Sequence, residues 1–158
     1  MTKALDLGCG TQPKNPFGAD EVFGVDVRDI GNIRRADLVV EPIPFGDAEF
    51  EFVTAHDFLE HVPRLIYAPS RRYPFVELMN EIWRVLKPGG QFLSVTPAFP
   101  HAAAFQDPTH VNIITEQTFP LYFDNTNCWA AMYGFTGKFR VKEQGWREPH
   151  LLTILIKD

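Results

Sequence analysis

The chain has few cysteines, no long apolar run and no excess of basic residues. Only two of its 158 residues are cysteines, Cys9 and Cys128. A disulfide framework is therefore excluded, and we expect a reducing, cytoplasmic setting. No apolar run approaches the roughly 20 residues that span a bilayer, so we expect no membrane partner. The net charge of -5 lacks the positive balance typical of proteins that bind nucleic acid.

Apolar runs and one helical segment alternate along the chain. The first five expected strands are Lys3–Leu7, Glu21–Val25, Ala36–Val40, Phe50–Ala55 and Gln91–Thr96. Pro74–Lys87 is predicted as a helix, because proline suits its first turn and apolar residues recur at helical spacing. Lys138–Glu143 and Leu151–Lys157 are predicted to pair as an antiparallel hairpin. The pattern indicates one α/β domain over residues 1–158, with a doubly wound, mostly parallel sheet, an antiparallel C-terminal edge hairpin and helices on both faces.

Glycines and a carboxylate follow the first two expected strands. Gly8 and Gly10 come directly after Lys3–Leu7, where a backbone without Cβ atoms can pass close to a ligand. Asp26 follows the second strand, where an acid can accept hydrogen bonds from ribose hydroxyls. A dinucleotide site would need a third glycine at the position of Pro13. The pattern therefore favours a nucleoside cofactor and disfavours a nicotinamide dinucleotide.

Leu5-Asp6-Leu7-Gly8-Cys9-Gly10-Thr11 resembles motif I of the class I S-adenosylmethionine-dependent methyltransferases. Four later segments resemble other family motifs in the family's order: Gly24-Val25-Asp26, Ile43–Val53, His56–Val62 and Glu81–Gly90. The resemblance covers about residues 4–97 and is to a small bacterial or phage-type member, similar to methyltransferase type 11. It implies a Rossmann-like fold, S-adenosyl-L-methionine as cofactor and S-adenosyl-L-homocysteine as product.

The resemblance also implies which residues hold the cofactor. Asp26 would take the two ribose hydroxyls, and Asp6 would orient the methionine ammonium group. The full set of expected cofactor-binding residues is Asp6, Gly8, Cys9, Gly10, Asp26, Val27, Val40, Glu41, Ala55 and His56.

Histidines supply the candidates for catalysis. A methyl group on a sulfonium is already activated, so we expect catalysis mainly by in-line positioning. His61 follows the fourth strand, and Asp107 and His110 lie in the long segment after the fifth. Asp107 would pair with His110 and fix its tautomer. We expect His110, His61 and Asp107 to be catalytic, and His101 and His110 to contact the acceptor. Three such groups can hold a metal, but no metal is expected.

The chain departs from the family pattern at its start. Only three residues precede Ala4, so we expect the chain to lack the helices that usually cover the cofactor in this family. We expect either an open cofactor site or one covered by a second subunit or by the loop 64–73. The predicted function is methyl transfer to a small-molecule acceptor, with nucleic acid disfavoured. The alternative is a non-catalytic S-adenosylmethionine-binding sensor or interaction module on the same fold.

Overall fold

A computed structural model describes residues 1–158 and shows one seven-stranded sheet. Its strand order is β3-β2-β1-β4-β5-β7-β6. The strands are β1 (Lys3–Leu7), β2 (Glu21–Asp26), β3 (Arg34–Arg35), β4 (Phe50–His56), β5 (Leu86–Pro97), β6 (Phe139–Arg147) and β7 (His150–Lys157). The first five strands pair in parallel, whereas β7 runs antiparallel to both β5 and β6. The predicted Rossmann-like, mostly parallel sheet with its antiparallel C-terminal hairpin is confirmed.

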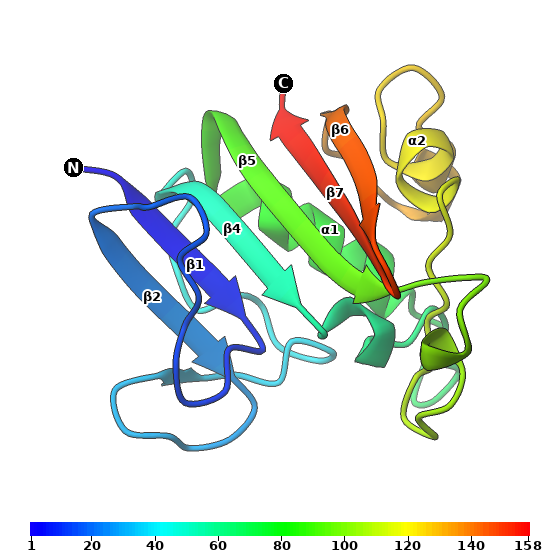
Figure 1. Cartoon of the computed structure of the whole chain (residues 1–158), viewed down its shortest axis with the longest axis horizontal. Helices are drawn as coiled ribbons and strands as arrows, with labels where there is room; N and C mark the ends of the chain where they lie inside the picture. Colours follow the sequence, from blue (N-terminus) through cyan, green and yellow to red (C-terminus); the bar gives the residue numbers. More distant parts are fainter.

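The parallel strands end at one edge of the sheet. The arrowheads of β1, β2, β4 and β5 all point toward the lower edge in Figure 1. The segments that follow these strands therefore meet there, including the turn at Gly8, Asp57 after β4 and the long segment after β5. Ligands of such sheets bind at this edge.

The helices gather on one face. Helix α1 (Pro74–Val85) lies behind the sheet in Figure 1 and buries its apolar side in the core. The short α2 (Thr118–Tyr122) packs against it through Phe75 and Phe119, whose ring centroids are 6.4 Å apart. Three 3-10 helices complete the chain: η1 (Leu59–His61), η2 (Ala102–Ala104) and η3 (Trp129–Tyr133). None of the helices has the length and apolarity needed to cross a membrane.

The opposite face of the sheet is covered in part by the connection between β1 and β2. Phe17 of this connection stacks on Phe52 of β4, with ring centroids 4.5 Å apart. Phe52 points away from α1, because its neighbour Val53 belongs to the core on the helix side. A loop thus occupies part of the second face.

The third predicted strand is wrong, because residues 36–41 form a turn. The amide groups of Val40 and Glu41 both donate to the Asp37 carbonyl, and the Glu41 carboxylate accepts from the Asp37 amide at 2.6 Å. These local bonds compete with strand pairing. The strand at this place is the two-residue β3, which ends before the apolar run begins.

Two element boundaries also differ from the prediction. Helix α1 ends at Val85 and β5 starts at Leu86, so the Lys87–Gly90 stretch that was expected to end the helix already belongs to the strand. Strand β6 extends to Arg147 and β7 begins at His150, so only Glu148 and Pro149 form the turn between them. This short turn brings His150 to the edge of the sheet where β5 ends, since His150 pairs with Pro97.

Candidate functional site

The turn after β1 requires glycine at two positions. Gly8 and Gly10 adopt φ angles of 64° and 61°, in the left-handed region that favours glycine. A Cβ on Gly8 would also lie 2.5 Å from the Phe58 ring. The amides of Gly8 and Cys9 both donate to the Val25 carbonyl of β2, at 2.8 and 3.2 Å. The turn is therefore fixed against the neighbouring strand.

Asp26 lies beside this turn with its carboxylate already in use. It is 6% exposed and accepts hydrogen bonds from the Gly10 amide at 2.9 Å and from the Arg28 amide at 3.0 Å. The Arg28 guanidinium adds a 2.9 Å contact, and this side chain is 63% exposed. The bond from Arg28 is the main reason why the pKa of Asp26 lies below its ordinary value. The guanidinium is thus the most exposed partner of this carboxylate.

Asp6 and His56 form a buried pair next to the turn. Asp6 is 1% exposed and accepts from the Thr54 hydroxyl at 2.6 Å and from the Lys14 amide at 2.8 Å. Asp6 therefore anchors the β1–β2 connection. His56 Nδ1 lies 3.6 Å from Asp6 Oδ1, is buried and has no hydrogen-bond partner. Such an orphaned group is rare in folded proteins and indicates a missing ligand or water.

The remaining predicted cofactor residues take varied positions. Val27 and Val40 are 52% and 59% exposed, as an adenine-contacting surface requires. Glu41 is exposed but is bonded to the turn at Asp37. Ala55 is in the core, so only its backbone can face the site. Burial raises the pKa of the Cys9 thiol to about 11, so Cys9 is protonated and a poor nucleophile.

Two of the predicted catalytic histidines meet at the carboxyl ends of β4 and β5. The rings of His61 and His110 touch edge to face, with centroids 4.8 Å apart. Glu60 joins them: one donor atom from each of the three side chains lies within 4.8 Å of the other two. Glu60 is 1% exposed, accepts from the Thr96 hydroxyl at 3.0 Å, and has its pKa raised, mainly by burial. We call these three residues the histidine cluster.

Asp107 lies at ion-pair distance from His110, as expected, whereas His101 lies apart from both residues. Asp107 Oδ2 is 3.8 Å from His110 Nε2, and His110 instead donates Nδ1–H to the Ala104 carbonyl at 3.1 Å. A backbone carbonyl rather than the predicted carboxylate therefore sets the tautomer of His110. Asp107 accepts from the Thr109 hydroxyl at 2.7 Å, and Thr109 contacts His61 Nδ1 at 3.0 Å. His101 packs on Trp146 and lies outside the histidine cluster.

Sequence reasoning missed a second imidazole at this edge. His150 Nε2 lies 2.7 Å from Asp57 Oδ1, although 93 positions separate the two residues. Asp57 adopts a φ of 49° directly after β4. The signal that would have found the pair is the short turn between β6 and β7, which places His150 beside the end of β5.

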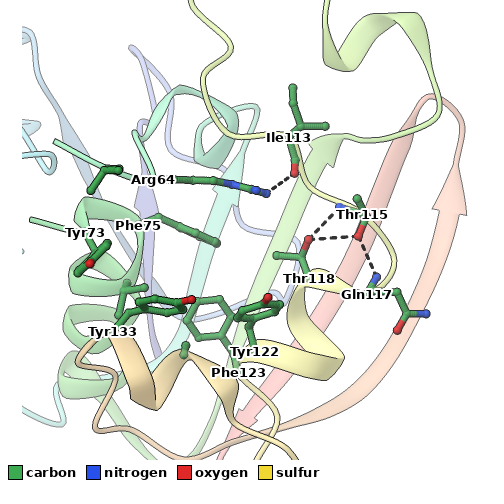
Figure 2. A pocket seen from close by; sticks show the side chains of 13 residues that line it. Arg64, Tyr73, Phe75, Ile113, Thr115, Gln117, Thr118, Tyr122, Phe123 and Tyr133 are labelled. Carbon is green, nitrogen blue, oxygen red and sulfur yellow. Dashed lines mark hydrogen bonds between the residues drawn. The ribbon is translucent and has the colours of Figure 1, made fainter.

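A cavity lies on the helix side of the sheet, and none of the three residues of the histidine cluster lines it. It has a volume of about 440 Å³ and lies between α1 and residues 113–133. Figure 2 shows Phe75, Phe123, Tyr122 and Tyr133 around its apolar interior, with the Arg64 guanidinium at one end. Arg64 Nε donates to the Asn112 Oδ1 atom at 2.6 Å, and the Asn112 amide donates to the Glu60 carbonyl at 3.1 Å. The wall of the cavity is thus continuous with the segment that carries the cluster.

Comparison with known families decides the broad assignment. A family profile described as a methyltransferase domain matches residues 5–94, which is more than half of the chain. The chain belongs to this methyltransferase family. The matched residues include the glycine turn, Asp26, Asp6, His56 and the first part of the histidine cluster.

Curated relatives of this family member are demethylmenaquinone methyltransferases. The protein of this name from Staphylococcus saprophyticus is 29% identical over 140 residues, which cover 77% of this chain and 52% of the relative. The one from Listeria welshimeri is 29% identical over 120 residues, which cover 63% of this chain and 47% of the relative. The chain therefore spans about half the length of the curated relatives it matches.

Solved structures share the fold of this family member. PH0226 from Pyrococcus horikoshii gives a TM-score of 0.66 at 19% identity, and 99% of this chain and 82% of that chain are covered. YcgJ from Bacillus subtilis gives a TM-score of 0.62 at 16% identity, and the match covers 99% of this chain and 92% of YcgJ. The [4+2]-cyclase SpnF also gives 0.66 at 16%, with 99% and 74% covered. The fold alone therefore does not fix the reaction, and the chemistry has to come from the site.

The residues at the turn fit the S-adenosylmethionine that this family implies. Gly8 and Gly10 give the turn a left-handed backbone that residues with a Cβ rarely adopt. The buried Nδ1 of His56 lacks a partner and lies beside Asp6, near the expected place of the methionine portion. Asp26 offers a buried carboxylate at the end of β2 for the ribose. The turn and the side chains of His56 and Asp26 thus have chemistry that suits this cofactor.

Proposed function

We propose that the chain is an S-adenosylmethionine-dependent methyltransferase that acts on a small-molecule acceptor bound beside the histidine cluster. One observation carries the proposal. The left-handed glycine turn, the buried Asp26 carboxylate and the pair of imidazoles all lie at the same carboxyl edge of one parallel sheet.

The cofactor half of the site would work by positioning. The backbone of Gly8, Cys9 and Gly10 would follow the methionine and ribose, and Asp26 would exchange the Arg28 guanidinium for the ribose hydroxyls. Val27, Val40 and Glu41 would border the adenine. Asp6 keeps the connection in place through the Lys14 amide, and His56 would receive a polar atom of the methionine portion.

The acceptor half would hold the nucleophile and take its proton. Bound S-adenosylmethionine supplies a methyl group on a sulfonium sulfur, which keeps the bonding electron pair and becomes the thioether of S-adenosylhomocysteine. The acceptor atom has to lie in line with the sulfur–methyl bond at about 3–3.5 Å. His61 and His110 would bind the polar acceptor group and accept its proton, which then passes to solvent. Asp107 would orient His61 through Thr109.

The neighbouring cavity indicates an acceptor with an apolar body. Its interior of phenylalanine and tyrosine rings suits an aromatic or aliphatic group, and Arg64 suits a carbonyl or anionic oxygen. The relatives named for demethylmenaquinone point to the same class, a quinone with an apolar chain. We therefore propose a quinone-like or other aromatic acceptor ahead of a sugar or a nucleic acid.

Titration calorimetry with S-adenosylhomocysteine tests the cofactor half. One equivalent should bind to the wild-type chain. A methyl-labelled S-adenosylmethionine assay with a panel of small acceptors, reduced demethylmenaquinone among them, then tests transfer. Absence of binding would overturn the proposal. Binding without transfer to any acceptor would instead favour a sensor on the same fold.

The cavity has its own test once an acceptor is found. Tyr122→Ala should raise the acceptor KM about tenfold at unchanged kcat, because removal of a ring that contacts both ground and transition state weakens uniform binding. Tyr67→Ala is the matched control, since Tyr67 is 67% exposed and lies outside the cavity. Equal effects of the two variants would place the acceptor elsewhere. Analytical ultracentrifugation with and without cofactor will show whether a second copy covers the site.

A further inference from the structure

The histidine cluster has the composition of a metal site. Glu60, His61 and His110 contribute one carboxylate and two imidazoles, with donor atoms that all lie within 4.8 Å of one another. Two histidines and one carboxylate on one side of an ion are a recurring ligand set for Zn²⁺ and for non-haem Fe²⁺. The sequence analysis considered Asp107, His110 and His101 for this role and expected no metal. The structure replaces two of those three residues.

Hydrogen bonding fixes the tautomers of both imidazoles. His110 Nδ1 faces the Ala104 carbonyl, which only accepts, so Nδ1 carries the proton. The single hydroxyl proton of Thr109 goes to the Asp107 carboxylate, so Thr109 accepts from His61 Nδ1–H. Nε2 is therefore the remaining ring nitrogen of each histidine. Neither Nε2 has a hydrogen-bond partner; the nearest acid, Asp107 Oδ2, is 3.8 Å from His110.

These same bonds are the outer partners that metal-binding residues require. A histidine ligand usually donates its other ring N–H to a carbonyl or toward a carboxylate, which orients the ring. His110 does so directly to Ala104, and His61 does so through Thr109 to Asp107. The third ligand is also held, because Glu60 Oε2 accepts from the buried Thr96 hydroxyl.

A pair of packed surface histidines is the simpler explanation of such a cluster, but it leaves two features without a reason. It does not explain why a 1%-exposed carboxylate lies against two rings whose Nε2 atoms have no hydrogen-bond partner. Nor does it explain why both Nδ1–H groups are bonded to partners outside the cluster. Zinc bonds of about 2.0–2.2 Å in a tetrahedral site put ligand atoms about 3.3–3.6 Å apart. The most distant pair, at 4.8 Å, would have to approach by about 1.2–1.5 Å, which side-chain rotations supply.

We propose that Glu60, His61 and His110 bind one divalent transition-metal ion of the Zn²⁺ class, with an open position facing the acceptor. Nitrogen donors favour such an ion over Mg²⁺ or Ca²⁺, which take oxygen ligands. The binding itself is independent of the proposed function. Its use rests on that function: the open position would take the acceptor's hydroxyl oxygen and lower its pKa. The hydroxyl proton would go to solvent before the methyl group passes to oxygen, and the imidazoles would then act as ligands in place of bases.

Metal titration of the full chain, without cofactor or acceptor, tests the site. The protein is stripped with a chelator, dialysed, and titrated with Zn²⁺ in a calorimeter. We expect one equivalent to bind. Titration with Co²⁺ should give the visible absorption of a low-symmetry, four- or five-coordinate complex. His61→Gln, His110→Gln and Glu60→Gln should each weaken Zn²⁺ binding by more than about 100-fold, since loss of an outer partner alone costs about 10–100-fold.

Control variants separate this site from other donors. His101→Gln and His150→Gln should leave the Zn²⁺ affinity within about twofold, and Cys9→Ser excludes the thiol. Thr109→Val removes only the outer partner of His61 and should weaken Zn²⁺ binding about 10-fold. This variant keeps the proposal testable if a ligand variant fails to fold. No stoichiometric Zn²⁺ binding by the wild-type chain, or binding that survives all three ligand variants, would overturn the proposal. Binding of S-adenosylhomocysteine by the stripped chain shows that this failure leaves the proposed function standing.

Discussion

The turn after β1 holds its groups through backbone contacts to a neighbouring strand, whereas the histidine cluster is assembled from side chains of distant segments. Gly10 and Asp26 are 16 positions apart. Glu60 and Thr96 are 36 positions apart, and His61 and Thr109 are 48. A fixed backbone suits a cofactor that is the same in every reaction of a family. A set of side chains on a long connection can change with the acceptor while the sheet stays the same.

His110→Ala should have the largest effect and should act on the acceptor half alone. Turnover should fall about 10²–10⁴-fold, because a group that takes a proton or holds the metal is lost. The affinity for S-adenosylhomocysteine, measured by calorimetry, should stay within about twofold. His101→Ala is the matched comparison and should change turnover less than about threefold, since His101 lies on Trp146. A large loss of cofactor affinity in His110→Ala would show that the two halves are not separable.

Gly8→Ala and Gly10→Ala compare two glycines in one turn. Both substitutions force alanine into the left-handed region, which costs about 1–2 kcal/mol. At Gly8 the new Cβ would also lie 2.5 Å from the Phe58 ring, whereas at Gly10 its nearest neighbour is the Arg28 guanidinium at 3.5 Å. Urea denaturation should therefore show a greater loss of unfolding free energy for Gly8→Ala. Equal losses would mean that Phe58 moves aside freely.

Asp26→Ala tests the cofactor half at its carboxylate. We expect the affinity for S-adenosylhomocysteine to fall by about 1.5–3 kcal/mol, or about 10–150-fold, the scale of hydrogen bonds to a charged group. Asp29→Ala is the control, because Asp29 is exposed just beyond the site. Unchanged affinity in the Asp26 variant would place the ribose elsewhere.

Arg28→Ala should have the smallest effect, and in the opposite direction. The guanidinium has to leave Asp26 before a ribose can bind, and its exposed ion pair is worth about 0.2–1 kcal/mol. Calorimetry should therefore show cofactor binding up to about fivefold tighter than in the wild-type chain. Weaker binding would mean instead that Arg28 contacts the cofactor.

The same contrast explains what the sequence could predict. The strands at Lys3–Leu7 and Phe50–His56 and the roles of Gly8 and Gly10 follow from local apolar runs and from the φ angles of a tight turn. Residues 36–41 were mispredicted because the Asp37 and Glu41 side chains bond to the local backbone of an apolar run. The position of Glu60 beside His110, and of His150 beside Asp57, depends on packing between elements, which no short pattern encodes.

The connection between β1 and β2 is secured before any ligand arrives. The buried Asp6 carboxylate accepts a hydrogen bond from the Lys14 amide. Three positions after Lys14, the Phe17 ring stacks on Phe52 of β4. An incoming nucleoside therefore meets a preorganised surface, and little conformational entropy of the loop is lost on association. The part of the site that has to rearrange is the exposed Arg28 side chain. Substitutions at this position can therefore change the cofactor affinity while the backbone of the turn stays the same.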